Sequence, residues 1–72
     1  MTLNEVKVSK TVKVINIYCE YALRQRLRDL GLMIGTRITP IFVSPLGNPV
    51  AYEFRGNIIA IRNEDAQKIN IQ

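Results

Sequence analysis

Residues 50–62 contain the clearest β-hairpin pattern of the chain, and they read Val-Ala-Tyr-Glu-Phe-Arg-Gly-Asn-Ile-Ile-Ala-Ile-Arg. Every second residue from Val50 to Phe54 is large and apolar, which is typical of a strand with one buried face. Gly56-Asn57 predicts a two-residue hairpin turn, because glycine suits the first central position of a type II′ turn. Residues 58–62 then form the returning strand.

Three further stretches have the composition of strands, namely residues 11–18, 36–43 and 68–71. In the first of these, the alternation changes phase after Val14, which predicts a β-bulge or burial on both faces. In the second, Pro40 cannot donate to a strand ladder, so this strand lies at a sheet edge or carries a bulge. Five short strands in one small domain cannot cover both faces of a flat sheet, and we expect them to curl into a small barrel.

An α-helix is expected at about residues 20–30, between the first two strands. Leu23, Leu27 and Leu30 recur at the spacing of one helix face, and Gly31 supplies a left-handed C-cap. A second, short helical turn is expected near residues 63–67, with Asn63 as its N-cap.

Composition excludes several classes of protein. The chain has 72 residues, one cysteine and no histidine or tryptophan. No disulfide can form within it, which predicts a reducing, cytoplasmic setting. Without histidine, the common zinc-ligand sets and the His-dependent nucleophile systems are excluded, and we expect no enzyme activity. No apolar run is long enough to cross a membrane, and the N-terminus does not resemble a signal peptide, so a membrane matters only through a partner.

Three blocks of residues resemble the ferrous iron transport protein A (FeoA) family, in the order and spacing of that family. They are Leu23 through Leu32 with Gly35-Thr36, Ser44 through Pro49, and Gly56 through Arg62 with Glu64, Ala66 and Ile69-Asn70-Ile71. The chain departs from the family at Met33-Ile34, where Thr-Pro is frequent. The resemblance implies one domain over residues 1–72, mainly β, with a five-stranded SH3-like barrel and one inserted helix.

The resemblance also implies a function. FeoA-like proteins are cytoplasmic accessories of ferrous iron uptake, and the expected partner is the cytoplasmic, GTP-binding side of the FeoB-type membrane permease. The family is also classed with transition-metal proteins, because the same domain forms the C-terminal part of iron-dependent repressors. Whether the chain forms a homo-oligomer stays open.

Four residues are candidates for partner contact. Tyr21, Arg24 and Arg28 fall on the helix face opposite the leucines, and Tyr and Arg are enriched at binding hot spots. A solvated helix face is the competing interpretation. Leu46 lies at the tip of a proline-rich turn, where it either meets a partner or folds back onto the barrel.

Metal binding has little support in the sequence. Cys19 is expected to be a small buried hydrophobe. The hard-metal ligands to consider are Glu20, Glu53, Glu64 and Asp65, and no two of them have a ligand-like spacing. We therefore expect no tight metal site and no cofactor, although weak transition-metal binding at oxygen donors is compatible with these residues.

Two other functions are alternatives to a role as an accessory protein of ferrous iron uptake. A net charge of +4 and the Arg24-Arg26-Arg28 run are compatible with nucleic-acid binding. Against it, we expect most of the five aromatic residues to lie in the core rather than on a stacking surface. The third reading is a metal-responsive domain like that of the iron-dependent repressors, but a chain of this length leaves no room for the DNA-binding domain that normally accompanies it.

Overall fold

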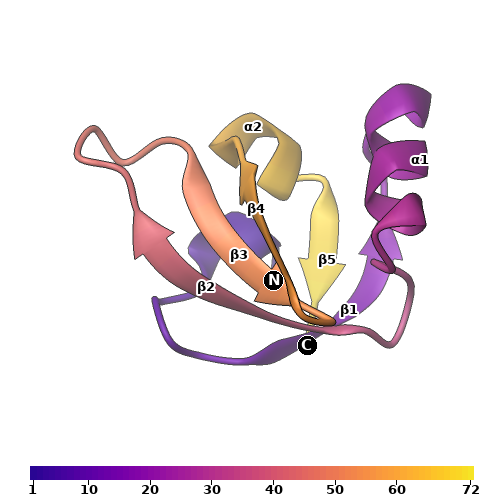
Figure 1. The fold of residues 1–72 in the computed structure, drawn as a ribbon, viewed down its shortest axis with the longest axis horizontal. Helices are drawn as coiled ribbons and strands as arrows, with labels where there is room; N and C mark the ends of the chain where they lie inside the picture. Colours follow the sequence, from indigo (N-terminus) through magenta and orange to yellow (C-terminus); the bar gives the residue numbers. More distant parts are fainter.

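The computed structural model describes residues 1–72 and contains one antiparallel sheet with the strand order β4-β3-β2-β1-β5 (Figure 1). In chain order the elements are the 3-10 turn η1 (Leu3–Glu5), β1 (Val12–Ile17), α1 (Tyr21–Asp29), β2 (Arg37–Val43), β3 (Val50–Phe54), β4 (Asn57–Ile61), α2 (Asn63–Ala66) and β5 (Ile69–Ile71). The expected mainly-β architecture with five strands and one inserted helix is confirmed.

The core shows that the sheet is curled. β4 and β5 are its two edges, yet Ile61 of β4 and Ile71 of β5 belong to the same cluster of buried apolar side chains. That cluster also takes alternate residues from the middle strands, including Val14 and Tyr52. A flat sheet would hold its two edges apart, so the sharing of one core requires a barrel-like curvature.

Both expected strand irregularities occur. The register of β1 against β5 shifts between Val14 and Asn16, where the alternation changes phase. The register of β2 against β3 shifts between Pro40 and Phe42. Since β2 lies in the middle of the sheet, the bulge interpretation of Pro40 is confirmed and the edge interpretation is wrong.

The hairpin turn lies one residue earlier than the sequence pattern predicts. Arg55 and Gly56 are its central residues, with φ values of 49° and 79°, as a type I′ turn requires. Asn57 is not a turn residue. It opens β4 opposite Phe54, and its side-chain Nδ2 donates a hydrogen bond of 2.8 Å to the carbonyl oxygen of Leu30. The hairpin tip is thereby attached to the end of α1.

α1 ends as predicted. Gly31 has a φ of 100°, and its N–H donates to the carbonyl of Arg28 at 2.9 Å. The N–H of Leu32 donates to the carbonyl of Leu27 at 2.9 Å, which completes a Schellman motif. Leu27 is fully buried, while Leu23 and Leu30 pack against the core from its margin. This leucine stripe fixes which face of α1 remains exposed.

Candidate functional site

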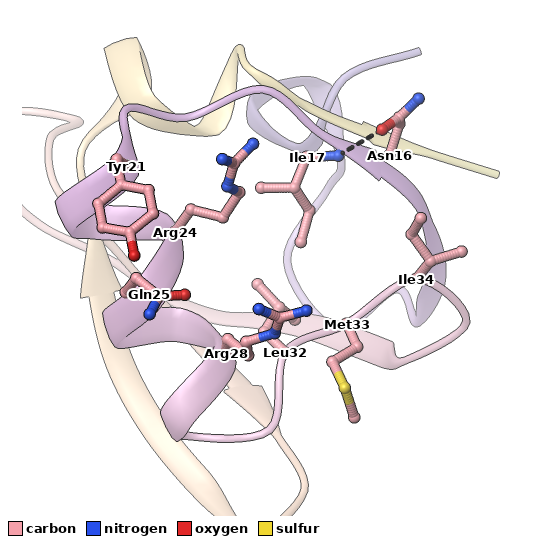
Figure 2. Close-up of a pocket in the computed structure, with 9 residues that line it drawn as sticks. All are labelled: Asn16, Ile17, Tyr21, Arg24, Gln25, Arg28, Leu32, Met33 and Ile34. Carbon is pink, nitrogen blue, oxygen red and sulfur yellow. Dashed lines mark hydrogen bonds between the residues drawn. The ribbon is translucent and has the colours of Figure 1, made fainter.

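A groove of about 610 Å³ lies between the exposed face of α1 and the segment that follows the helix (Figure 2). Its helical wall consists of Tyr21, Arg24, Gln25 and Arg28. These residues are three or four positions apart, so they share one side of the helix. Since the leucine stripe faces the core, this wall faces outward, and three of the four predicted contact residues lie together on it.

The opposite wall is mostly apolar. It consists of Asn16 and Ile17 at the end of β1 and of Met33 and Ile34 in the loop before β2, with buried Leu32 beneath them. Figure 2 shows Arg24 extending from α1 toward Ile17, and Arg28 lying over Leu32 beside Met33. Ile34 is 71% exposed, although it is a large apolar residue. The groove thus has one cationic wall and one apolar wall.

The positive charge of the groove is not neutralised from within. Arg24 and Arg28 line it, and no acidic residue does. Neither guanidinium takes part in the side-chain hydrogen bonds of the structure. Both side chains can therefore accept an anionic partner without first breaking an internal bond.

The fourth predicted contact, Leu46, lies elsewhere. The β2–β3 loop that carries it projects from the end of the molecule opposite α1 (Figure 1). Leu46 is 95% exposed, so the alternative in which it folds back onto the barrel is wrong.

The β2–β3 loop is held in place by α2. The N–H of Asn63 donates to the side chain of Asn48 at 2.9 Å, and its side-chain amide donates to the carbonyl of Gly47 at 3.0 Å. The prediction that Asn63 is the N-cap of α2 is wrong. Asn63 is the first helical residue, and Arg62 takes the cap position. The side chain of Asn63 is engaged by the loop instead of by the helix.

The aromatic residues differ from expectation. Tyr52 and Phe54 are buried, but Tyr18, Tyr21 and Phe42 are exposed, so the prediction that most aromatics lie in the core is wrong. Phe42 follows the bulge in β2, which turns its side chain outward. Of the three exposed aromatics, Tyr21 alone lines the groove.

The structure contains no group of three or more His, Cys, Asp or Glu side chains placed to hold a metal ion. Cys19 is 4% exposed, and its thiol donates to the carbonyl oxygen of Asp65 at 3.5 Å. Burial, together with the nearby Asp65 carboxylate, raises the pKa of this thiol. Cys19 is accordingly a protonated packing residue.

No helix in the structure is both long and apolar enough to span a bilayer.

Sequence reasoning named three of the nine residues that line the groove and missed the other six. Gln25 follows from helical spacing once Tyr21 and Arg28 are chosen. Met33-Ile34 gave a usable signal, because two apolar residues stand in a loop where small or polar residues are usual. That these two residues lie across the groove from α1 depends on a tertiary contact that spacing does not encode.

Comparison with known proteins places the chain in a family. The model of the FeoA domain matches residues 1–72. The chain is 28% identical over its full length to a Fe(2+) transport protein A/Fe(2+) transporter FeoB fusion protein of Porphyromonas gingivalis. It spans only 8% of the length of that relative.

Solved structures agree with the family match. The FeoA protein of Chlorobium tepidum has a TM-score of 0.94 and 32% identity, with 99% of this chain and 68% of that chain covered. FeoA of Stenotrophomonas maltophilia, solved with zinc and described as an SH3 domain protein, has a TM-score of 0.85 and 24% identity, with coverages of 100% and 89%. The barrel is therefore of the SH3 type, as the sequence resemblance implied, and the chain belongs to the FeoA domain family, which is linked to ferrous iron transport.

Proposed function

We propose that this chain is a non-enzymatic, cytoplasmic accessory of ferrous iron uptake that docks on the cytoplasmic GTP-binding side of a FeoB-type permease. The observation that carries the proposal is the Porphyromonas relative, in which a sequence similar to this whole chain is fused to the transporter FeoB. Fusion holds two modules at a high effective concentration, which is useful where the modules bind each other.

Binding alone is a sufficient mechanism for such an accessory. A protein that binds one conformation of a transporter more tightly than another shifts the transporter toward the first conformation. The size of the shift is limited by the difference between the two affinities. The proposed role therefore requires that the permease domain bind this chain with different affinity in its GTP and GDP states.

Two surfaces are available for this contact. The first is the helical wall of the groove, with Tyr21, Arg24 and Arg28. The second is Leu46, whose loop is already fixed by the hydrogen bonds from Asn63, so little conformational entropy is lost when Leu46 is buried. Because these surfaces lie at opposite ends of the molecule, a permease domain that uses both must span the barrel.

A calorimetric titration of the chain with the isolated GTP-binding domain of its permease tests the proposal. It is performed with GDP and with a non-hydrolysable GTP analogue. Leu46→Ser should weaken binding by about 1.5–3 kcal/mol, the value of burying one leucine side chain. Ile58→Ser is the matched control, because Ile58 is also exposed but belongs to neither surface. Absence of binding in both nucleotide states would refute the proposed function.

A further inference from the structure

The two walls of the groove have different chemistry, and together they specify what the groove can hold. On the helical wall, Arg24 and Arg28 are one helical turn apart, so their guanidinium groups can share one carboxylate or take two neighbouring ones. On the other wall, Met33 and Ile34 expose apolar surface to solvent. An occupant that matches both walls is anionic on one side and apolar on the other.

We propose that the groove binds an acidic segment of the permease, with its carboxylates on Arg24 and Arg28 and an apolar side chain against Met33 and Ile34. This inference rests on the proposed function and adds the chemistry of the partner segment. The groove volume of about 610 Å³ lies within the usual range of ligand sites, about 300–1,000 Å³. It accommodates a few side chains of a peptide rather than a whole protein face.

Charge complementarity favours an acidic peptide over the other partners of a basic protein. Single-stranded nucleic acid needs a row of aromatic side chains for its bases, and Tyr21 is the one aromatic residue that lines the groove. A nucleic-acid backbone would also leave the apolar wall without a contact. A peptide carboxylate, in contrast, fits the planar guanidinium in bidentate geometry, and a neighbouring apolar side chain covers Ile34.

Charge reversal provides the first test, again by titration with the GTP-binding domain of the permease. The double variant Arg24→Glu/Arg28→Glu is compared with Arg26→Glu/Arg37→Glu, which has the same net charge. Arg26 lies on α1 and Arg37 on β2, and both are exposed outside the groove. We expect the groove variant to bind about 30-fold more weakly or worse. The control variant should bind less than about fivefold more weakly than the wild type.

The apolar wall is tested separately. Ile34→Ser should weaken binding by about tenfold, because one apolar contact is lost. The variant should fold normally, since Ile34 is exposed in the free chain. Overlapping synthetic peptides that cover the cytoplasmic segments of the permease identify the bound segment, and the strongest binders should combine acidic and apolar residues.

Each outcome either supports or overturns the inference. If the groove variant and the control variant bind equally well, or lose equal affinity, the groove is not the acidic-segment site, although the proposed docking stands. If the strongest peptides are neutral or basic, or if single-stranded DNA binds in an Arg24- and Arg28-dependent way, the inference is also wrong. If the wild-type chain does not bind the domain at all, the proposed function itself fails.

Discussion

Replacing Asn57 with aspartate tests the attachment of the β3–β4 hairpin to α1. The side-chain Nδ2 of Asn57 donates to the carbonyl oxygen of Leu30, the C-cap residue of α1, at 2.8 Å. Carbonyl groups at a helix C-terminus lack partners within the helix and carry partial negative charge. The bond therefore satisfies a helix end and also links two segments that are distant in the sequence.

The expected decreases in the free energy of unfolding follow from this geometry. Asn57→Ala removes one neutral hydrogen bond, which costs about 0.5–1.5 kcal/mol. Asn57→Asp loses the same donor and places an ionised oxygen beside the negative end of the helix, at a further cost of about 0.3–1 kcal/mol. A domain of this length has a free energy of unfolding of about 4–11 kcal/mol, so both losses are measurable.

Urea unfolding monitored by circular dichroism measures the two variants at pH 7 and in mild acid. At pH 7 the aspartate variant should be the less stable of the two. The negative helix end raises the folded-state pKa of the introduced carboxyl. The variant therefore regains stability as the pH falls through this raised pKa, and the recovery is complete near the unfolded pKa of about 4. If Asn57→Asp is as stable as the wild type at pH 7, the hydrogen bond does not hold the hairpin to α1.

Three further tests probe the scaffold. Gly31→Ala and Gly35→Ala should each lower the free energy of unfolding in urea by about 1–2 kcal/mol, because both glycines have positive φ. Gly31→Ala should lose about 0.5–1.5 kcal/mol more, since its Cβ would lie 2.8 Å from Cδ of Arg55. That excess should vanish in an Arg55→Ala background. Leu27→Ala should lower the free energy of unfolding by about 2–5 kcal/mol, because the side chain is fully buried. Burial raises the pKa of the Cys19 thiol, so this thiol should react slowly with a thiol reagent at pH 8 in the folded chain and completely in urea. Fast reaction of the native protein would contradict the burial of Cys19.

The elements of the fold were predictable because their signals are local. Alternation over residues 50–54 and the leucine spacing in α1 each need only a few neighbouring residues, and both predictions are confirmed. The predicted hairpin turn is wrong by one residue, because a glycine fits either central position of a tight turn and does not by itself fix which one it occupies. Arg55 adopts positive φ in the structure, and its side chain packs beside Gly31, a contact that no local pattern reveals.

The candidate site was predictable only in part. Helical spacing brought Tyr21, Arg24 and Arg28 to one face, because such spacing follows from helix geometry. The apolar wall depends on how the loop after α1 folds back, and the sequence pattern does not contain that information. The same holds for Asn63, whose side chain braces the Leu46 loop rather than capping α2.

The most direct measurement of the central claim is a titration of the permease GTP-binding domain with the wild-type chain and with Arg24→Glu/Arg28→Glu, in both nucleotide states. We expect the wild type to bind with an affinity that depends on the nucleotide, and the variant to bind at least about 30-fold more weakly. Equal binding by both proteins would contradict the role of the groove, and no binding by the wild type would contradict the docking function.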